Sequence, residues 1–584
     1  MVYILGIHDG HNASACLLKD GKIVACAQEE RFTRIKNIAA FPLYSIEFVL
    51  RYAGITSSDL DLVVVASDYG SFGWYKSYNL GILGALYRKV VRDTTVLSTL
   101  DIRVRPKKLA LLLGDLLSRP VGRIIRRKSL NIIADILGID RDVVISVDHH
   151  LCHAYTAIFS SPFPTRNEDA LVFTADGEGD FISSRVYIFK DGVLEKISES
   201  PTKDSLGYFY SHVTKYLGMK PLEHEYKVMG LAPYAPEYGV KKVLDKIMDL
   251  YYVDGLKIRS RFHAYEILEI LIDRLSWMRF DWIAGAAQKL LETILIKWIR
   301  NAIQLTKIHN IAVAGGIFMN VKANMKIADL PEVKKMFAMP SAGDESLSIG
   351  AAYYGYKLLK PDAKIEPLRD LYLGPEYSDE EIIEEIERFR SDEAFEVEYH
   401  KDIDDVIAEL LIEGKIVARV SGRMEFGARA LGNRSILADA SDRRIVEIIN
   451  KAIKKRDFWM PFAPTILGEY ADEYLKAPDW KKTNPEYMIF AYESTEKARN
   501  DLEAAMHPYD KTLRPQILWR DWNPGYYKIL KKFADETGRF GLLNTSYNLH
   551  GEPIVCSPRD AIETFLRSGL KYLALGKYLL IKKR

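Results

Sequence analysis

YILGIHDGHNASACLLKDGKIVACAQEE, residues 3–30, has the pattern of three short strands, joined by a polar Asp-Gly loop and a tight Lys-Asp-Gly turn. Apolar and polar residues that alternate around such turns are typical of antiparallel hairpins. The segment LVFTADGEGDFISSRVYIFKDGVLEKI, residues 171–197, repeats the same order of strand, Asp-Gly loop, strand, turn and strand. A repeat at this long spacing predicts a duplicated domain rather than a solenoid.

Two matched halves that face each other are typical of the actin/Hsp70/sugar-kinase superfold (ASKHA), in which glycine-rich turns hold phosphates in a cleft. The proline-containing, mixed-charge segment at residues 360–381 predicts a domain boundary near residue 362. Residues 1–362 would then form the duplicated domain and residues 363–584 a second domain. Strands and helices alternate in both, so we expect an α/β or α+β chain throughout.

Composition excludes several classes of protein. The chain has 584 residues, which is too long for one hydrophobic core, and a net charge of +2, which favours neither nucleic acid nor membrane. Its four cysteines lack CxxC spacing, so neither a disulfide framework nor a zinc ribbon is expected. We find neither a signal-peptide pattern nor an apolar run of membrane-spanning length. A cytoplasmic protein is expected, with peripheral membrane association left open.

Residues 71–129 form a basic insertion between the first repeat and the segment that follows it, with many lysines and arginines against three aspartates. Apolar stretches interleave with these charges. One interpretation is a surface that binds an acidic or lipid-linked substrate, or a membrane face. The other is an amphipathic helical insertion with a solvated basic face.

Three histidines lie within DHHLCHAYTAIF, residues 148–159. With Asp148 as the N-cap of a helix, His149 and His153 share one face and can share a metal ion. Two histidines make an incomplete site, and Asp176 and Asp344, each beside glycines at a strand end, can complete it. The alternative is a helix whose histidines only pack at a domain seam.

Other residues suit catalysis or nucleotide binding. Asp9 and His11 lie in the first Asp-Gly loop, where they can deprotonate a hydroxyl or simply form a turn. Gly315 and Gly316 follow a strand, so the backbone there can approach a nucleotide, with Asn320 in reach of its ribose or base. A further pair, in HEYKVMGLAPYA, can contact substrate or pair with each other: Glu225 and Lys227.

The second domain has a recurring set of cations beside glycines and apolar residues. Arginine forks match phosphate and carboxylate groups. This pattern predicts an anion cradle for a phosphorylated small molecule and for ATP, and because GxxxxGK[ST] is absent it is not a P-loop. The predicted cradle residues are Arg423, Arg429, Arg434, Lys455, Arg456 and Arg514.

Taken together, the motifs HDGHNASACLL, EERFTR, DHHLCHAYTAIFSSPF, DGEGD, HEYKVMGLAPY, AGGIFMN, GDESLSIGAA, GRMEFGARALGNRSILAD and LLNTSYNLHGEPIV resemble the O-carbamoyltransferases of nodulation factors and antibiotics. The resemblance runs from end to end and is weakest in the insertion. It implies an iron-binding, actin-like N-terminal domain, with manganese or zinc also compatible with the ligands. It also implies a YrdC-like C-terminal domain that makes carbamoyladenylate from carbamoyl phosphate and ATP with Mg²⁺.

The resemblance also implies roles for the residues named above. His149, His153, Asp176 and Asp344 would bind the metal, and His11, with Asp9, would act as the base at the acceptor hydroxyl. Gly315, Gly316 and Asn320 would hold the adenylate. The cradle cations, joined by Asn544, would line the carbamoyl phosphate and ATP site.

The expected activity is ATP-dependent O-carbamoyl transfer to a sugar-like, glycolipid or secondary-metabolite alcohol, by a monomer or homodimer. Carbamoylation of a protein thiol is an alternative, although the zinc-finger cysteines and acylphosphatase segment of that system are absent. A tRNA-modifying protein is another, but the small net charge argues against nucleic acid as a partner. A nucleotide-binding module without turnover also stays open.

Overall fold

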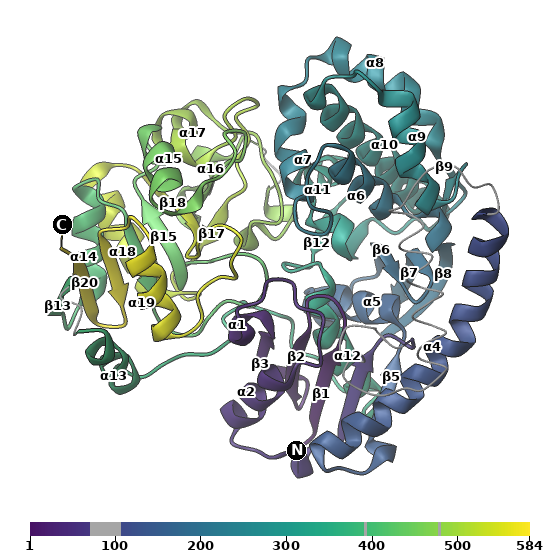
Figure 1. Cartoon of the computed structure of the whole chain (residues 1–584), viewed down its shortest axis with the longest axis horizontal. Coiled ribbons are helices and arrows are strands. Elements are labelled where there is room, and N and C mark those ends of the chain that lie inside the picture. The colour runs from purple at the N-terminus through teal and green to yellow at the C-terminus, as the bar shows by residue number, and fades with distance from the viewer. Residues whose placement is uncertain (70–106, 391–393, 477–479, 584) are drawn as a thin grey trace.

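The computed structural model describes residues 1–69, 107–390, 394–476 and 480–583, and of residues 107–118 the backbone only (Figure 1). Most of the predicted basic insertion, residues 70–106, lies outside the described residues. The described chain is mixed α/β, as expected. None of its helices is long and apolar enough to cross a membrane.

The first repeat forms one side of a five-stranded sheet with the order β3-β2-β1-β4-β5. The first three strands are antiparallel, and the last two run parallel to β1. The strands are β1 (Tyr3–His8), β2 (Ser14–Lys19), β3 (Lys22–Gln28), β4 (Leu62–Ala66) and β5 (Val144–Val147). Apolar residues of α2 (Leu43–Ala53) and α4 (Lys107–Leu137) cover one face of this sheet.

The second repeat builds a sheet of the same design, with the order β8-β7-β6-β11-β12. Again three antiparallel strands are followed by two parallel ones. The strands are β6 (Ala170–Gly179), β7 (Ile182–Lys190), β8 (Val193–Pro201), β11 (Asn310–Ala314) and β12 (Lys335–Ala338). The identical strand order confirms the predicted duplication.

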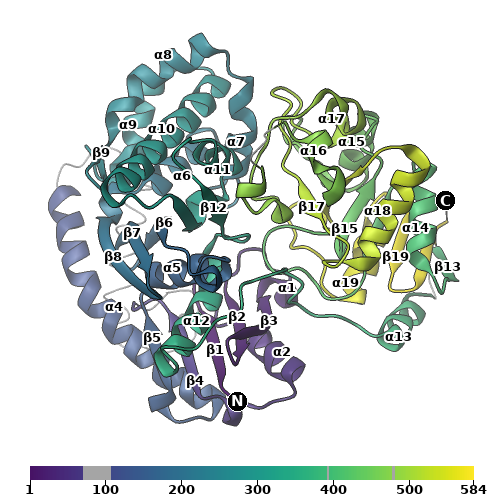
Figure 2. The same ribbon diagram turned by 180° about the vertical axis from the view of Figure 1, so that it is seen from behind.

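Two helices lie between these sheets in both views, α5 (His149–Ser160) and α12 (Leu347–Leu359) (Figures 1 and 2). A helical lobe covers the second sheet, and its centre is α10 (Phe280–Thr306), whose Trp298 is fully buried. The lobe also holds α6 (Leu206–Tyr216), α7 (Glu225–Leu231), α8 (Glu237–Ile247), α9 (Ile267–Leu275), α11 (Val321–Ala328) and the hairpin of β9 (Tyr251–Asp254) and β10 (Lys257–Ser260).

The C-terminal part is built on an eight-stranded mixed sheet with the order β13-β20-β19-β14-β15-β18-β16-β17. Its strands are β13 (Phe395–Tyr399), β14 (Val417–Val420), β15 (Arg434–Ala438), β16 (Ala463–Leu467), β17 (Gln516–Leu518), β18 (Gly541–Ser546), β19 (Tyr572–Leu575) and β20 (Tyr578–Lys582). Its helices are α13 (Asp379–Phe389), α14 (Ile403–Ile412), α15 (Arg444–Ile449), α16 (Ala471–Tyr474), α17 (Glu496–Asp501), α18 (Pro524–Thr537) and α19 (Pro558–Arg567). The YrdC-like resemblance of this part stays a prediction.

The predicted end of the insertion at residue 129 falls inside α4, which continues to Leu137. The apolar side chains Ile125, Leu130 and Ile133 of this helix belong to the core of the first sheet. Part of the basic segment is therefore an integral layer of the N-terminal domain.

Candidate functional site

The sequence-predicted metal ligands come together at the start of α5. Asp148 caps this helix as expected, and its carboxylate accepts from the backbone N–H of Leu151 at 2.8 Å. One turn then separates His149 from His153, and their Nε2 atoms lie 3.7 and 3.1 Å from Oδ2 of Asp176. Both Nε2 atoms are 3.6 Å from Oδ1 of Asp344. The four donor atoms all lie within 4.8 Å of one another.

The chemistry of this cluster fits a divalent cation. Burial and the neighbouring Asp176 carboxylate raise the pKa of Asp344 well above its usual value, because two carboxylates in a low-dielectric setting repel each other. His149 Nε2 is buried and has no hydrogen-bond partner within the described chain. A cation between the four donors would satisfy this nitrogen and neutralise the carboxylates. Two imidazoles and two carboxylates suit Fe, Mn or Zn.

The first Asp-Gly loop lies beside this cluster. Burial lowers the pKa of His11, although the charge of Asp176 opposes that shift. His8 is hydrogen-bonded through Nε2 to the carbonyl of His11 at 2.9 Å, which fixes the loop. The carboxylate of Asp9 is fully buried and accepts from Arg126 of α4 at 2.7 and 2.9 Å. Asp9 therefore anchors the loop to α4, a role that the sequence did not indicate.

The predicted nucleotide loop touches the metal cluster. Gly315 has a φ of +102°, and a Cβ there would lie 2.3 Å from the carbonyl oxygen of Ala175. A Cβ on Gly316 would lie 3.1 Å from Oδ1 of Asp176. Only glycine permits this approach, which leaves backbone groups next to the cluster.

Asn320 has a structural task. Its side chain caps α11 by accepting from the N–H of Ala323, and it exchanges two hydrogen bonds with Gln288 at 2.8 and 3.1 Å. These contacts engage the amide with protein groups, and the predicted contact with a ribose or base stays a prediction.

Three of the predicted cradle cations gather in the C-terminal part. Arg429, Arg456 and Arg514 are partly buried, and within the described chain no carboxylate is paired with any of them. Burial and the charge of Arg456 lower the pKa of Arg429 to about 10, and burial and the charges of the other two arginines also lower the pKa of Arg514 well below its usual value. Nε of Arg429 and Nε of Arg514 are buried, and neither has a hydrogen-bond partner among the described residues. Repelling guanidiniums with unused donors form a ready anion site.

Glu345 connects this arginine cluster with the metal cluster. Its carboxylate, next to Asp344, is close enough to act electrostatically on both His153 and Arg429. The two parts of the chain touch here: Gly427, with a φ of +98°, lies so close to Ser341 that a Cβ would be 2.4 Å from its Oγ. Arg31 also donates to the carbonyl of Gly427 at 2.6 Å. The arginine cluster and the His/Asp cluster therefore face one interface.

The sequence matches two family models, one for each part of the chain. The model of the carbamoyltransferase N-terminus matches residues 3–353, and that of the carbamoyltransferase C-terminus matches residues 408–582. The chain belongs to the carbamoyltransferase family. The metal cluster lies within the first match, and the arginine cluster within the second.

Named relatives agree with this assignment. Nodulation protein NolNO of Sinorhizobium fredii is 33% identical over 98% of this carbamoyltransferase and 79% of its own length. Nodulation protein NolO of Bradyrhizobium diazoefficiens is 34% identical over 75% of this chain and 79% of its own. Component A of the (R)-2-hydroxyglutaryl-CoA dehydratase of Acidaminococcus fermentans is a weak structural likeness, with a TM-score of 0.35, 18% identity and coverage of 61% and 99% of the two chains.

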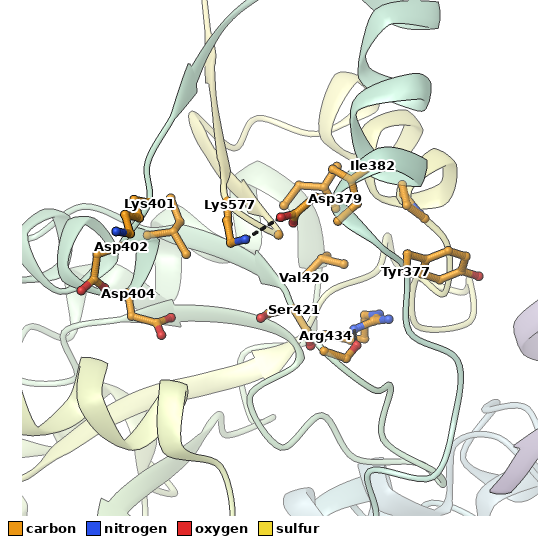
Figure 3. Close-up of a pocket in the computed structure, with 15 residues that line it drawn as sticks. Tyr377, Asp379, Ile382, Lys401, Asp402, Asp404, Val420, Ser421, Arg434 and Lys577 are labelled. Atoms are coloured by element: carbon orange, nitrogen blue, oxygen red, sulfur yellow. Dashed lines mark hydrogen bonds and ion pairs between the residues drawn. The ribbon is translucent and has the colours of Figure 1, made fainter. Parts of the chain in front are cut away.

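Two predicted cradle arginines of the carbamoyltransferase are structural. Arg423 donates to the carbonyls of Val24, Leu373 and Gly374, and thus ties β3 to the C-terminal part. Arg434 is 1% exposed and donates to five backbone carbonyls, those of Pro375, Ser421, Gly422, Asn433 and Cys556. It lines a separate cavity of about 290 Å³, which also holds the ion pair of Asp379 and Lys577 (Figure 3). Neither arginine joins the cluster of three.

The last two predicted cradle residues, Lys455 and Asn544, lie in different surroundings. Lys455 is exposed, at the left-handed end of a helical turn, and its buried neighbour Lys454 donates to Ser546 and Asn548 instead. Asn544 is buried in β18 and donates to the carbonyl of Ala430, next to Arg429, at 3.2 Å. Its Oδ1 has no hydrogen-bond partner in the described chain, so this atom is available beneath the arginine cluster.

Glu225 and Lys227 do not pair with each other. Glu225 accepts from Ser211 and from the N–H of Leu222, both at 2.8 Å. Lys227 forms an ion pair of 3.1 Å with Asp457, next to Arg456 in the C-terminal part. Lys227 therefore holds the interface beside the anion site.

Sequence reasoning missed Glu345, Arg126 and Asp180. Glu345 directly follows the predicted ligand Asp344 in GDES, and this position was the one sequence signal that could have pointed to it. Arg126 comes from a segment distant in sequence, and its pairing with Asp9 depends on the tertiary fold. Asp180 accepts from the backbone N–H groups of His149 and Asp68, both at 2.9 Å, and so holds the start of α5 against the loop after β4; no spacing rule indicates these contacts.

Proposed function

We propose that this carbamoyltransferase is an ATP-dependent O-carbamoyltransferase. Carbamoyl phosphate loses orthophosphate to water, and the carbamate oxygen attacks the α-phosphorus of ATP, so that carbamoyladenylate forms and pyrophosphate leaves. An acceptor hydroxyl then attacks the carbamoyl carbon, giving the carbamate ester, AMP and a proton. The observation that carries this proposal is the cluster of Arg429, Arg456 and Arg514 across an interface from the His/Asp cluster.

The first step belongs to the arginine cluster. Three guanidiniums that pair with no carboxylate of the described chain suit an oligophosphate, because each fork can donate two hydrogen bonds. They also stabilise the charge that accumulates on the leaving pyrophosphate. Asn544 Oδ1, as an acceptor beneath the cluster, suits the carbamoyl NH₂ group.

The second step belongs to the His/Asp cluster. Gly316, beside Asp176, offers its backbone N–H to the adenylate phosphate, whereas the N–H of Gly315 donates to the carbonyl of Ala342 at 2.8 Å and fixes the turn. His149, His153, Asp176 and Asp344 would hold a cation, which when bound would supply positive charge near the carbamoyl oxygen and the leaving AMP. His11, kept neutral by burial, takes the proton of the acceptor hydroxyl, and the Asp9–Arg126 pair holds its loop in place.

The shared interface suits transfer of a labile intermediate. An adenylate released into water would hydrolyse, whereas the sites here face each other across Glu345. The acceptor is a sugar-like, glycolipid or secondary-metabolite alcohol, in keeping with the nodulation names of the relatives.

Pyrophosphate release tests the proposal. The purified, metal-loaded protein is incubated with ATP and Mg²⁺, with and without carbamoyl phosphate. Pyrophosphate that appears only when both substrates are present supports adenylate formation. Pyrophosphate from ATP alone, or none at all, contradicts it.

A further inference from the structure

Helix α4 reaches three loops of the metal site with one face. Arg126 binds Asp9 in the loop after β1, and it also donates to the carbonyls of Ala66 and Tyr69 after β4. One turn earlier, a Cβ on Gly122 would lie 3.0 Å from the ring of Tyr69. A helix packed this closely on the loops is part of the wall of the site.

The loops beneath α4 are strained and joined to a metal ligand. Ser67, Asp180 and Phe181 all have left-handed φ values, of +78°, +52° and +65°, which is unusual for residues other than glycine. The Asp180 carboxylate accepts from the hydroxyl of Ser67 and from the backbone N–H of His149. Strain of this kind is retained where it serves a site. The rim formed by Ser67–Tyr69 and Asp180–Phe181 thus borders the metal cluster.

Two exposed arginines of α4 lie on this rim. The guanidinium of Arg119 is 5.0 Å from the ring centre of Phe181, and that of Arg123 is 5.6 Å from that of Tyr69. The two rings meet edge to face at 4.8 Å. Within the described chain no carboxylate is paired with either arginine, although both are fixed by aromatic contact.

Stacking uses the face of a guanidinium and leaves the N–H groups at its edge free for a planar or tetrahedral anion. We infer that Arg119 and Arg123 form an acceptor subsite that binds a phosphate group carried by the alcohol to be carbamoylated. This inference rests on the proposed function and adds the chemical class of the acceptor to it. The phosphate stays at the rim while the hydroxyl of the same molecule reaches the metal cluster and His11.

The test uses full-length, metal-loaded protein and carbon-13-labelled carbamoyl phosphate with ATP. Aqueous and lipid extracts of the cells that make the protein serve as acceptor sources, each with and without prior phosphatase treatment. Labelled product is detected by mass spectrometry. We expect a phosphate-bearing product that phosphatase pretreatment of the extract abolishes, and the extract in which it appears tells a free from a lipid-linked phosphate.

The variant Arg119→Gln/Arg123→Gln should reduce labelled product at least about tenfold, because the charge-assisted hydrogen bonds of both guanidiniums to the phosphate are lost. Its pyrophosphate release should equal that of the wild type. Lys128→Gln, which removes an exposed cation of the same helix about 140° around its axis from Arg123, should change neither.

The possible failures are distinguishable. Absent pyrophosphate in the wild type contradicts the proposed function itself. Three results overturn this inference alone, provided that the wild type releases pyrophosphate. They are a product that resists phosphatase pretreatment of the extract, no labelled product from either extract, and equal product from the Arg119/Arg123 variant.

Discussion

Arg126 and Asp9 form a buried bidentate ion pair, with Nη1–Oδ2 and Nη2–Oδ1 distances of 2.7 and 2.9 Å. The pair spans 117 residues of sequence, and its side chains are 2% and 1% exposed. It joins the loop of His11 to α4. The position of the His11 loop therefore depends on a helix whose first half falls within the predicted insertion.

Removal of one partner of this pair leaves a buried, uncompensated charge. We predict that Arg126→Ala lowers the free energy of unfolding by about 3–5 kcal/mol. Urea denaturation followed by circular dichroism measures the loss. The double variant Asp9→Ala/Arg126→Ala should lose less than the sum of the single variants, because neither charge is then stranded. Additive losses would show that the two side chains do not stabilise each other.

The four proposed metal ligands should act as one set. We predict that His153→Ala lowers bound metal to a small fraction of the wild-type content and abolishes carbamoyl transfer, because three donors remain where four converge. Elemental analysis after reconstitution with Fe²⁺, Mn²⁺ or Zn²⁺ measures the loss. His150→Gln is the matched control, since His150 binds Thr174 and the carbonyl of Ile182 instead. Equal metal content in His153→Ala and the wild type would disprove the ligand set.

The arginine cluster should control the first half-reaction. We predict that Arg514→Gln lowers kcat/KM for carbamoyl-phosphate-dependent pyrophosphate release at least about tenfold, because one charged donor to the phosphates is lost. Lys455→Gln, on an exposed neighbouring lysine, should leave the rate unchanged. A coupled pyrophosphate assay measures both. The assignment fails if the two variants behave alike.

The pH dependence of transfer should report the burial of His11. Burial lowers its pKa, so the neutral, proton-accepting form persists below the usual histidine value of about 6.5. We expect the acidic limb of the transfer rate to reach half its maximum below this pH. Metal content measured at each pH separates this effect from ligand protonation. A midpoint at or above the usual value would contradict a buried base.

Hairpins, caps and repeats could be predicted from the sequence because they depend on neighbouring residues. The Asp-Gly and Lys-Asp-Gly turns indicated both sheets, and Asp148 indicated the start of α5. The metal set could also be assembled, because its members sit beside glycines at strand ends and within a known motif.

Side-chain partners across the fold could not be predicted in the same way. Arg423, Arg429 and Arg434 look alike in sequence, yet backbone carbonyls surround Arg434 whereas Arg429 has an orphaned Nε. Asn320 resembles a nucleotide ligand but caps α11, since its helix begins one residue later. Backbone carbonyls from distant segments decide which arginine side chains are already hydrogen-bonded and which can still bind an anion. The local sequence around each arginine does not indicate these carbonyls.

The division of labour between the two sites is the central claim, and His11→Ala tests it most directly. The variant and the wild type are compared for carbamoyl-phosphate-dependent pyrophosphate release and for carbamoylated product, with circular dichroism as the check on folding. The account predicts wild-type pyrophosphate release and product reduced by at least about a hundredfold, the usual contribution of a general base. A folded His11→Ala variant that releases no pyrophosphate, or that still makes product at the wild-type rate, would contradict it.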